Sequence, residues 1–288
     1  MDEGPDVMFT VADLDTNDDT IEVIASQFFG KCLSLHSITI GSKPFISFRR
    51  IIDDTSGTLF SSILADFDVN ENHSSSSMVI DSGSTVPTLQ HGDSFSHILV
   101  TSHESKFSNW LPNGNKRDGI RTSSSVTSIN EHSNKHHETD GGSLFAFRIP
   151  KQNWKTETWT KQVIATGFHV KGQLSNMINP GAPGFCYTFY PTKKKQQQQR
   201  PLIAVSGDCA ESAYIFRPAT SKDHHEDPST YYKLMCEIDI DATVGSLAIG
   251  YSNFCDIEGQ SDGCAKIFIP AYEKNKILVF SMEDKIEF

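Results

Sequence analysis

The stretch VADLDTNDDTIEVIAS, from Val11 to Ser26, contains an apolar run, an acidic turn and a second apolar run. The first run ends at the alternating carboxylates Asp13 and Asp15, and the second is rich in β-branched residues. Short runs of this kind, bounded by turn-forming residues, are typical of β-strands. The stretch therefore predicts two strands joined by an acidic turn, and it raises the question of whether the turn also binds a metal ion.

A unit of short apolar runs recurs along the chain, whereas helical periodicity is scarce. The runs of the first unit are DVMFTVADLD, DTIEVIAS, CLSLHSITI and FISFRRII, and those of the second are LFSSILADFD, SHILVTSHES, GSLFAFRIP and WTKQVIAT. The third unit contains GFCYTFYP, RPLIAVSGD and SAYIFRP, and the fourth contains YKLMCEIDID, GSLAIGYSN, AKIFIPAY and KILVFSM. Repeated units of four short strands are typical of the blades of a β-propeller.

The recurrence predicts an all-β chain that forms one β-propeller domain over residues 1–288, with about four blades of four antiparallel strands visible. Asp13 and Asp66 end the first runs of two successive units and lie 53 residues apart, close to the roughly 40–50 residues of one blade. Four polar segments of low complexity interrupt the units. We expect them on loops, near residues 72–93, 106–141, 193–200 and 221–229.

The number of units predicts an incomplete ring. Without the polar segments about 210 residues remain, enough for four blades of ~50 residues each. Propellers have four to eight blades and must close, because an open end exposes an apolar face. We therefore expect either further blades before the amino terminus or an arc that pairs with another copy, so self-association is anticipated.

Charge and hydropathy limit the partners. The chain has 25 Lys and Arg against 36 Asp and Glu, a net charge of -11, which repels phosphate backbones. Nucleic acid is therefore not expected as a partner. No run approaches the roughly 18 apolar residues of a membrane helix, so membrane insertion is not expected either. As written, the chain is expected to be soluble and cytoplasmic, and extracellular if the amino terminus is incomplete.

The strand ends ADLD and ADFD, with the acidic turns and apolar strands that follow, resemble the FG-GAP or VCBS repeats of integrin-α-type β-propellers. In that family, loops of Asp-x-Asp-x-Asp-Gly type bind calcium, so the resemblance implies Ca²⁺ as a cofactor. Some fungal carbohydrate lyases, the aldos-2-ulose dehydratases, are similar in placing their chemistry on such a propeller. The resemblance therefore implies a binding scaffold and leaves an enzyme open.

Two acidic loops have the alternation of oxygen ligands that calcium requires. In the first loop the candidate ligands are Asp13, Asp15, Asn17 and Asp19. In the second loop they are Asp66, Asp68, Asn70 and Asn72. Asp18 and Glu71 occupy the sixth position, where such loops prefer glycine. The alternative interpretation is that these side chains cap the amides of their own turns.

The turns after the second strand of each blade are expected on one face of the disc, opposite the acidic loops. They read SQFFGK, SHESK, SGDCAES and SNFCD, and they contain four candidate catalytic residues, His103, Glu104, Asp208 and Glu211. A histidine and several carboxylates around a central channel are suited to acid–base chemistry on a sugar. Polar residues are also common in turns that have no such role.

Two classes of function follow. The leading one is a non-catalytic propeller scaffold that binds a protein or a glycan on the channel face, with calcium stabilising the opposite loops. The alternative is a carbohydrate-active lyase or hydrolase that uses His103, Glu104, Asp208 and Glu211. Whether the chain is an enzyme is left open by the sequence, with a non-enzyme favoured. Convergence of these four side chains would favour the enzyme.

Overall fold

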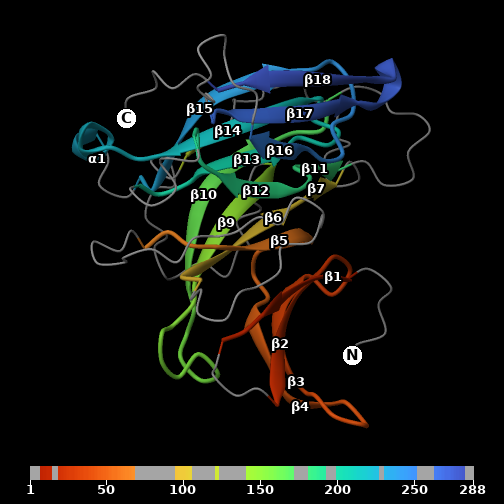
Figure 1. The fold of residues 1–288 in the computed structure, drawn as a ribbon, viewed down its shortest axis with the longest axis vertical. Helices are drawn as coiled ribbons and strands as arrows, with labels where there is room; N and C mark the ends of the chain where they lie inside the picture. The colour runs from red at the N-terminus through yellow and green to blue at the C-terminus, as the bar shows by residue number, and fades with distance from the viewer. Residues whose placement is uncertain are drawn as a thin grey trace, which may run out of the picture.

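The computed structural model describes most of the chain in several segments. They are residues 7–14, 19–68, 95–105, 121–122, 141–171, 181–192, 199–226, 230–251 and 263–282. Four antiparallel sheets of three or more strands follow one another from the amino-terminal to the carboxyl-terminal part (Figure 1), and the short strands β7 and β11 form a further two-stranded sheet. The expectation of an all-β chain of short antiparallel strands is confirmed for the described residues.

The first two sheets contain the strands predicted for the first two units. The first sheet has the order β1 (Val7–Ala12), β2 (Thr20–Gln27), β3 (Cys32–Thr39) and β4 (Phe45–Asp53). The second has the order β5 (Leu59–Ala65), β6 (His97–Ser102), β9 (Gly142–Arg148) and β10 (Thr160–Phe168), and the short strand β8 (Arg121–Thr122) adds to β10.

The third and fourth sheets divide the remaining strands differently from the prediction. The third sheet has the order β12 (Cys186–Phe189), β13 (Leu202–Ser206), β14 (Ser212–Pro218) and β15 (Tyr232–Asp239). The fourth has three described strands, β16 (Ala248–Tyr251), β17 (Ala265–Ala271) and β18 (Lys276–Ser281). The assignment of YKLMCEIDID to the fourth unit was wrong, because β15 pairs along its whole length with β14.

Two of the segments expected on loops contain regular structure. Arg121–Thr122, inside the 106–141 segment, form β8 at the edge of the second sheet. Ser221–Glu226 form the helix α1. Thr220 begins this helix: its backbone N–H and its hydroxyl donate to Asp223, which also pairs with Arg217 and Lys233. A capping box of this type stabilises a helix even where apolar residues are few.

Apolar side chains fill the spaces between successive sheets. One cluster lies between the first and second sheets, another between the second and third, and another between the third and fourth. The strands of the two internal sheets, such as β9 and β13, are buried on both faces. Their near-continuous apolar sequences follow from this, because a strand that is covered on both sides has no solvent-facing positions.

The first strands of successive sheets lie side by side, β1 against β5 and β5 against β12. The Thr10 hydroxyl donates to the Ser62 carbonyl at 2.9 Å, and the Ser61 hydroxyl lies 3.4 Å from the Gly184 carbonyl. The first strands of the first three sheets are therefore neighbours, and the turns at their ends are brought close to one another.

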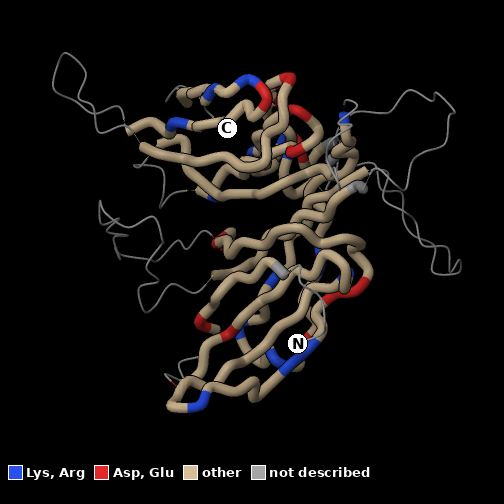
Figure 2. Tube along the Cα trace, turned by 90° about the vertical axis from the view of Figure 1, so that its right-hand side faces the viewer, with Lys and Arg blue, Asp and Glu red and all other residues tan. Residues whose placement is uncertain are grey.

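Charged residues are spread over the four sheets, with Lys and Arg interspersed among Asp and Glu along the described backbone (Figure 2). Within the described residues, no helix combines the length and the hydropathy that a membrane crossing requires.

Candidate functional site

Three turns that each follow the second strand of a sheet meet at one place. Phe28 follows β2, His103 follows β6 and Asp208 follows β13. The rings of Phe28 and His103 are 5.7 Å apart in an edge-to-face arrangement. His103 Nε2 lies 4.0 Å from Asp208 Oδ2. The structure therefore brings together two of the four candidate catalytic residues, and it does so in the way that strand alternation predicted.

His103 is held rigidly and is almost completely buried, with 3% of its side chain exposed. Its ring stacks on Phe60 with centroids 4.0 Å apart, and its backbone N–H donates to the Thr58 carbonyl at 2.8 Å. Gly181 packs against the other side of the ring so closely that a Cβ at this position would overlap it. Any larger residue at 181 would displace the imidazole.

The environment keeps the His103 ring neutral. Burial lowers its pKa to about 4, and the backbone carbonyl of Pro183 acts in the opposite direction. Within the described part of the chain, neither ring nitrogen of His103 has a hydrogen-bond partner. Unpaired buried nitrogens of this kind are rare in folded proteins and occur preferentially at functional sites.

Asp208 has a fixed backbone and a partly accessible carboxyl group. Its N–H donates to the Val244 carbonyl at 2.9 Å, and the Val244 N–H donates back at 3.1 Å. Its φ of 50° lies in the left-handed region, which aspartate tolerates better than most residues. Its side chain is 18% exposed. Burial raises the pKa of Asp208 to about 6, with the Cys209 thiol acting in the opposite direction.

The corresponding turn of the fourth sheet is the short 3₁₀ helix Tyr272–Lys274 between β17 and β18. Glu273 in this turn accepts the Thr243 N–H at 2.7 Å and also the Thr243 hydroxyl. Burial raises the pKa of Cys209 to about 12, and the charges of Asp208 and Glu273 act in the same direction, so Glu273 belongs to the same neighbourhood.

Sequence reasoning missed Glu273 because it counted β15 as a strand of the fourth unit. That error shifted the strand numbering, and the turn SNFCD was taken as the equivalent position. SNFCD, residues 252–256, lies outside the described residues. The signal that could have identified Glu273 is the short turn YEKN between two strongly apolar runs.

The other two candidates have different surroundings. The backbone of Glu104 belongs to the two-residue strand β7 (Glu104–Ser105), which pairs with β11 (Gly181–Ala182), but its side chain lies outside the description. Glu211 is fixed through its backbone: its carbonyl accepts the N–H groups of Ile240 and Asp241, and its φ is 58°. Its described contacts therefore connect the third sheet to the following segment.

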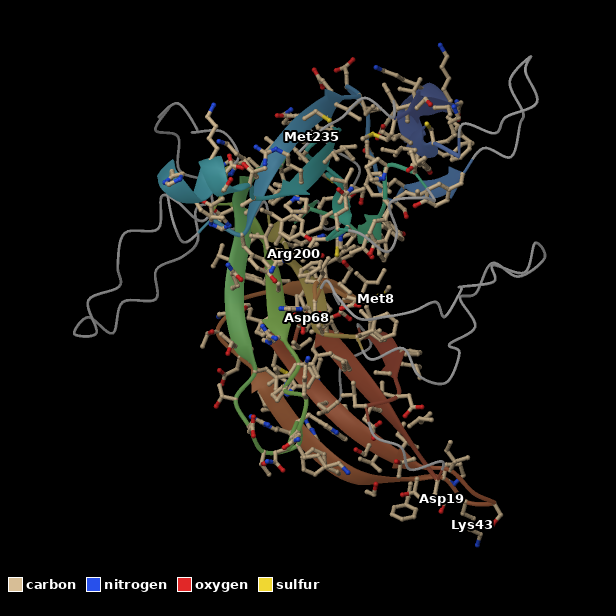
Figure 3. The ribbon with its side chains drawn as sticks, turned by 60° about the vertical axis from the view of Figure 1, so that its left-hand side comes forward. Met8, Asp19, Lys43, Asp68, Arg200 and Met235 are labelled. Carbon is tan, nitrogen blue, oxygen red and sulfur yellow. The ribbon has the colours of Figure 1, made fainter. Side chains whose placement is uncertain are left out.

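The first acidic loop lies at the far end of the first sheet. Figure 3 shows Asp19 beside Lys43 at the tip of this sheet, whereas Met8 lies toward the opposite end of β1. The Asp19 carbonyl accepts the Ile40 N–H at 2.7 Å, which joins the β1–β2 loop to the β3–β4 hairpin. Asp13 also lies within the description, whereas Asp15 and Asn17 lie outside it.

The second acidic loop has contacts that favour turn capping at its first two positions. Asp66 Oδ1 accepts the backbone N–H of Asp68 at 3.1 Å, the contact expected of an Asp that caps its own turn. The Asp68 carboxylate lies 3.2 Å from Arg148 and 3.6 Å from Lys151, two cations that compete with a metal ion. Asn70 and Asn72 lie outside the described residues.

Among the residues that the structure describes, no group of three or more His, Cys, Asp or Glu side chains is placed to hold a metal ion. At the convergent turns the structure places a partly exposed carboxyl group beside a buried imidazole. Such a pair can accept hydrogen bonds from a polar ligand or exchange a proton with it.

Comparisons of the chain with models of known protein families, with curated protein sequences and with solved structures find no match.

Proposed function

We propose that the four sheets are blades of a β-propeller scaffold of the FG-GAP or VCBS kind. Three features support this proposal: consecutive antiparallel strands in each sheet, apolar packing between successive sheets, and first strands that lie side by side. These features are the ones that a blade arrangement requires.

The scaffold binds a glycan or a protein partner on the face formed by the turns after the second strands. The observation that carries this proposal is the convergence of Phe28, His103 and Asp208 from three successive sheets. An aromatic ring and a carboxylate contributed by neighbouring turns suit a sugar or a polar protein loop, because the ring covers an apolar patch and the carboxylate accepts hydrogen bonds.

A carbohydrate-active lyase or hydrolase is the second candidate, and a separate observation favours it. Burial raises the pKa of Asp208 to about 6, so this carboxyl group exchanges protons close to neutral pH. A group that changes protonation near the working pH is the most effective general acid or base. His103, neutral and buried beside it, would position the carboxyl group.

Calcium at the first acidic loop is part of the same proposal. Asp13 and Asp19 lie at the two ends of the β1–β2 connection, at the edge of the sheet away from the convergent turns. A bound Ca²⁺ would hold this connection and the neighbouring hairpin in place and would take no part in ligand binding. The contacts of Asp66 and Asp68 give the second loop less support.

Binding and turnover on a panel of immobilised and soluble glycans test these proposals together. We expect a ligand whose binding falls at least tenfold in Asp208→Asn, since the amide has the shape of the carboxyl group without its charge. Asp54→Asn, an exposed aspartate after β4, is the matched control and should bind as wild type does.

The outcomes separate the two candidates. Product formation with a rate that falls below pH 6 in the wild type, and that Asp208→Asn abolishes, would select the enzyme. Binding without product would select the scaffold. Equal binding by Asp208→Asn and wild type would reject the face defined by the convergent turns.

A further inference from the structure

The fourth sheet ends at a strand whose outer edge has no neighbour among the described residues. In each of the other three sheets a fourth strand, β4, β10 or β15, pairs with the third strand. The third strands β3, β9 and β14 are accordingly buried over most of their length. The equivalent strand of the fourth sheet is β18, and none of its six residues is buried. Within the described part of the chain, β18 pairs only with β17 (Figure 1).

The register of β18 shows which of its backbone groups face this free edge. Met282, directly after β18, donates its N–H to the Ala265 carbonyl on β17 at 2.9 Å, and these two residues continue the register of the pair. Residues of an antiparallel strand alternate between those that bond to a given neighbour and those that face away from it. The even-numbered residues of β18 therefore bond to β17, and the N–H and C=O groups of Ile277, Val279 and Ser281 point to the free edge.

Pro270 on β17 agrees with this alternation. It lies opposite Ile277, and proline has no N–H group to donate. Proline is tolerated within a paired strand where its nitrogen faces away from the partner. The pair formed by Pro270 and Ile277 is therefore one whose backbone groups point away from each other, as the bond of Met282 requires.

The free edge of β18 lacks the features that usually prevent another strand from adding to an edge. Such features are charged residues, proline and bulges. The run from Ile277 to Phe280 is continuously apolar, and the register of β18 with β17 contains no shift. Ile277 is 67% exposed and Val279 is 55% exposed. The edge is therefore suited to accept a further strand.

The free edge is also complementary to itself. A second copy related by a two-fold axis that passes through Val279, perpendicular to the strand, presents its β18 in the antiparallel direction. Val279 then lies opposite Val279 of the second copy, and Ile277 lies opposite Ser281. In this register all three residues whose backbone groups face the edge obtain hydrogen-bond partners.

The side chains are compatible with the same register. Leu278 would lie opposite Phe280 of the second copy, and both side chains already pack at the margin of the apolar cluster between the third and fourth sheets. Lys276 would lie opposite Met282, so no like charges face each other across the pair. Directly opposed like charges are what destabilises antiparallel pairing.

We infer that β18 pairs with β18 of a second copy of this chain, so that the three described strands of each fourth sheet join into one continuous sheet. The strand of the second copy takes the place that a fourth strand has in the other three sheets. The inference requires neither a ligand at the convergent turns nor closure of a ring. A contact along one strand edge is smaller than a standard protein interface, so the dimer should dissociate on dilution.

Two measurements test the pairing in the wild type. Light scattering after size exclusion, between about 1 and 500 µM, should show a change from the mass of one chain to the mass of two. Hydrogen exchange measured by NMR should slow with rising concentration at the amides of Ile277, Val279 and Ser281. The amides of Leu278 and Phe280 already bond to β17 and should change little. This alternation distinguishes pairing at the edge from contact through a face of the sheet.

Substitutions of Val279 test the two-fold register. Val279→Lys and Val279→Glu should each be monomeric where the wild type is a dimer, because residue 279 faces itself and like charges would meet. An equimolar mixture of the two should dimerise, since opposite charges then meet. Val279→Pro should weaken dimerisation at least tenfold, because it removes the central N–H and no bond to β17. Val279→Thr keeps the N–H and the branched shape, and it is the control that should dimerise.

Several results would overturn the inference. A wild-type chain that stays monomeric at the highest concentration would reject the second copy as the partner of β18. A dimer that persists in Val279→Lys alone, or a mixture with Val279→Glu that stays monomeric, would reject pairing about residue 279. Equal slowing of exchange at all amides of β18 would place the contact on a face instead of the edge. Circular dichroism and the melting temperature of each variant distinguish a lost contact from a lost fold.

Discussion

At the scale of single residues, the ionised form of Asp208 lowers the stability of the folded protein, and its partial exposure to solvent reduces this cost only in part. Its carboxyl group titrates near pH 3.8 in the unfolded chain, whereas burial raises its pKa in the folded protein to about 6. Ionised Asp208 therefore disfavours the folded state above pH 6, and this penalty disappears as the pH falls from 6 to 4. Such a penalty is typical of a group retained for function.

Replacing Asp208 by Asn should consequently stabilise the protein at pH 8 and have little effect at pH 4. A shift of about two pKa units corresponds to roughly 3 kcal/mol at most; because the side chain reaches solvent, we expect about 1–2 kcal/mol. Urea unfolding of variant and wild type at both pH values measures the difference. Comparing the two proteins cancels the contribution of His97, whose lowered pKa acts in the opposite direction.

The matched variant for this experiment is Asp54→Asn, which alters an exposed carboxylate and should change the free energy of unfolding equally little at pH 8 and pH 4. If Asp208→Asn destabilised the protein at pH 8, the Asp208 carboxylate would be making a favourable contact in the folded state, and the assignment of its raised pKa to burial would be wrong.

The aspartates of the first acidic loop give a second prediction at this scale. If the loop binds calcium, added Ca²⁺ should raise the melting temperature in proportion to the logarithm of free ion above the dissociation constant. Asp13→Ala and Asp15→Ala should remove this shift, whereas Asp68→Ala, which breaks an ion pair with Arg148, should keep it. A shift that persists in all three variants would favour turn capping in the first loop.

At the scale of strands and helices, the sequence predicted the first two sheets well because each strand there is a separate apolar run between turn residues. It failed at β15 because the motif CEIDID resembles the ends of β1 and β5. Such a motif marks a turn, but it does not specify which neighbour the strand pairs with. Pairing with β14 depends on contacts across the sheet, and the sequence of β15 alone does not specify these contacts.

The convergent site was predictable to the same extent. Because antiparallel strands alternate in direction, the turns after second strands lie at the same end of each sheet. Placing His103 and Asp208 there required only that the strands of each unit be counted correctly. The close packing of Gly181 on His103 was not predictable, because it arises from a segment that enters between two sheets. Glu273 was missed for the reason that β15 was misplaced.

Deleting a polar segment tests a prediction at the scale of strands and loops. Deleting residues 193–200, joined by a short Gly-Ser linker, should leave the melting temperature within a few degrees, because the segment contains no large apolar side chain. Arg200 does contact the packed part of the protein, because its Nε donates to the Phe67 carbonyl and its guanidinium lies over Tyr231. A deletion of 193–198 that spares Arg200 is the matched variant; a large fall there would contradict the prediction.

At the scale of the whole molecule, the strands differ in how much of their surface is buried by neighbouring sheets. The strands β6, β9, β13 and β14 of the second and third sheets are buried on both faces, whereas β4 of the first sheet and β18 of the fourth are largely exposed. Since amides exchange slowly where opening exposes the most apolar surface, β6, β9, β13 and β14 should exchange slowest and β4 and β18 fastest. Hydrogen exchange by mass spectrometry at low protein concentration measures this order. Uniform exchange over all four sheets would instead indicate that the molecule opens as a single cooperative unit and that the end sheets are no weaker than the others.

Because each sheet is made from one continuous part of the chain, the order of synthesis becomes the order of assembly. The first sheet is complete once residue 53 has left the ribosome, but the apolar cluster on its inner face is complete only with Phe145 and Phe147 of β9, which begins at Gly142. At 5–20 residues per second this wait is about 4–18 s. During that interval Ile24, Leu33 and Leu35 have only part of their partner sheet, so the nascent chain should be a chaperone client at this stage of its translation.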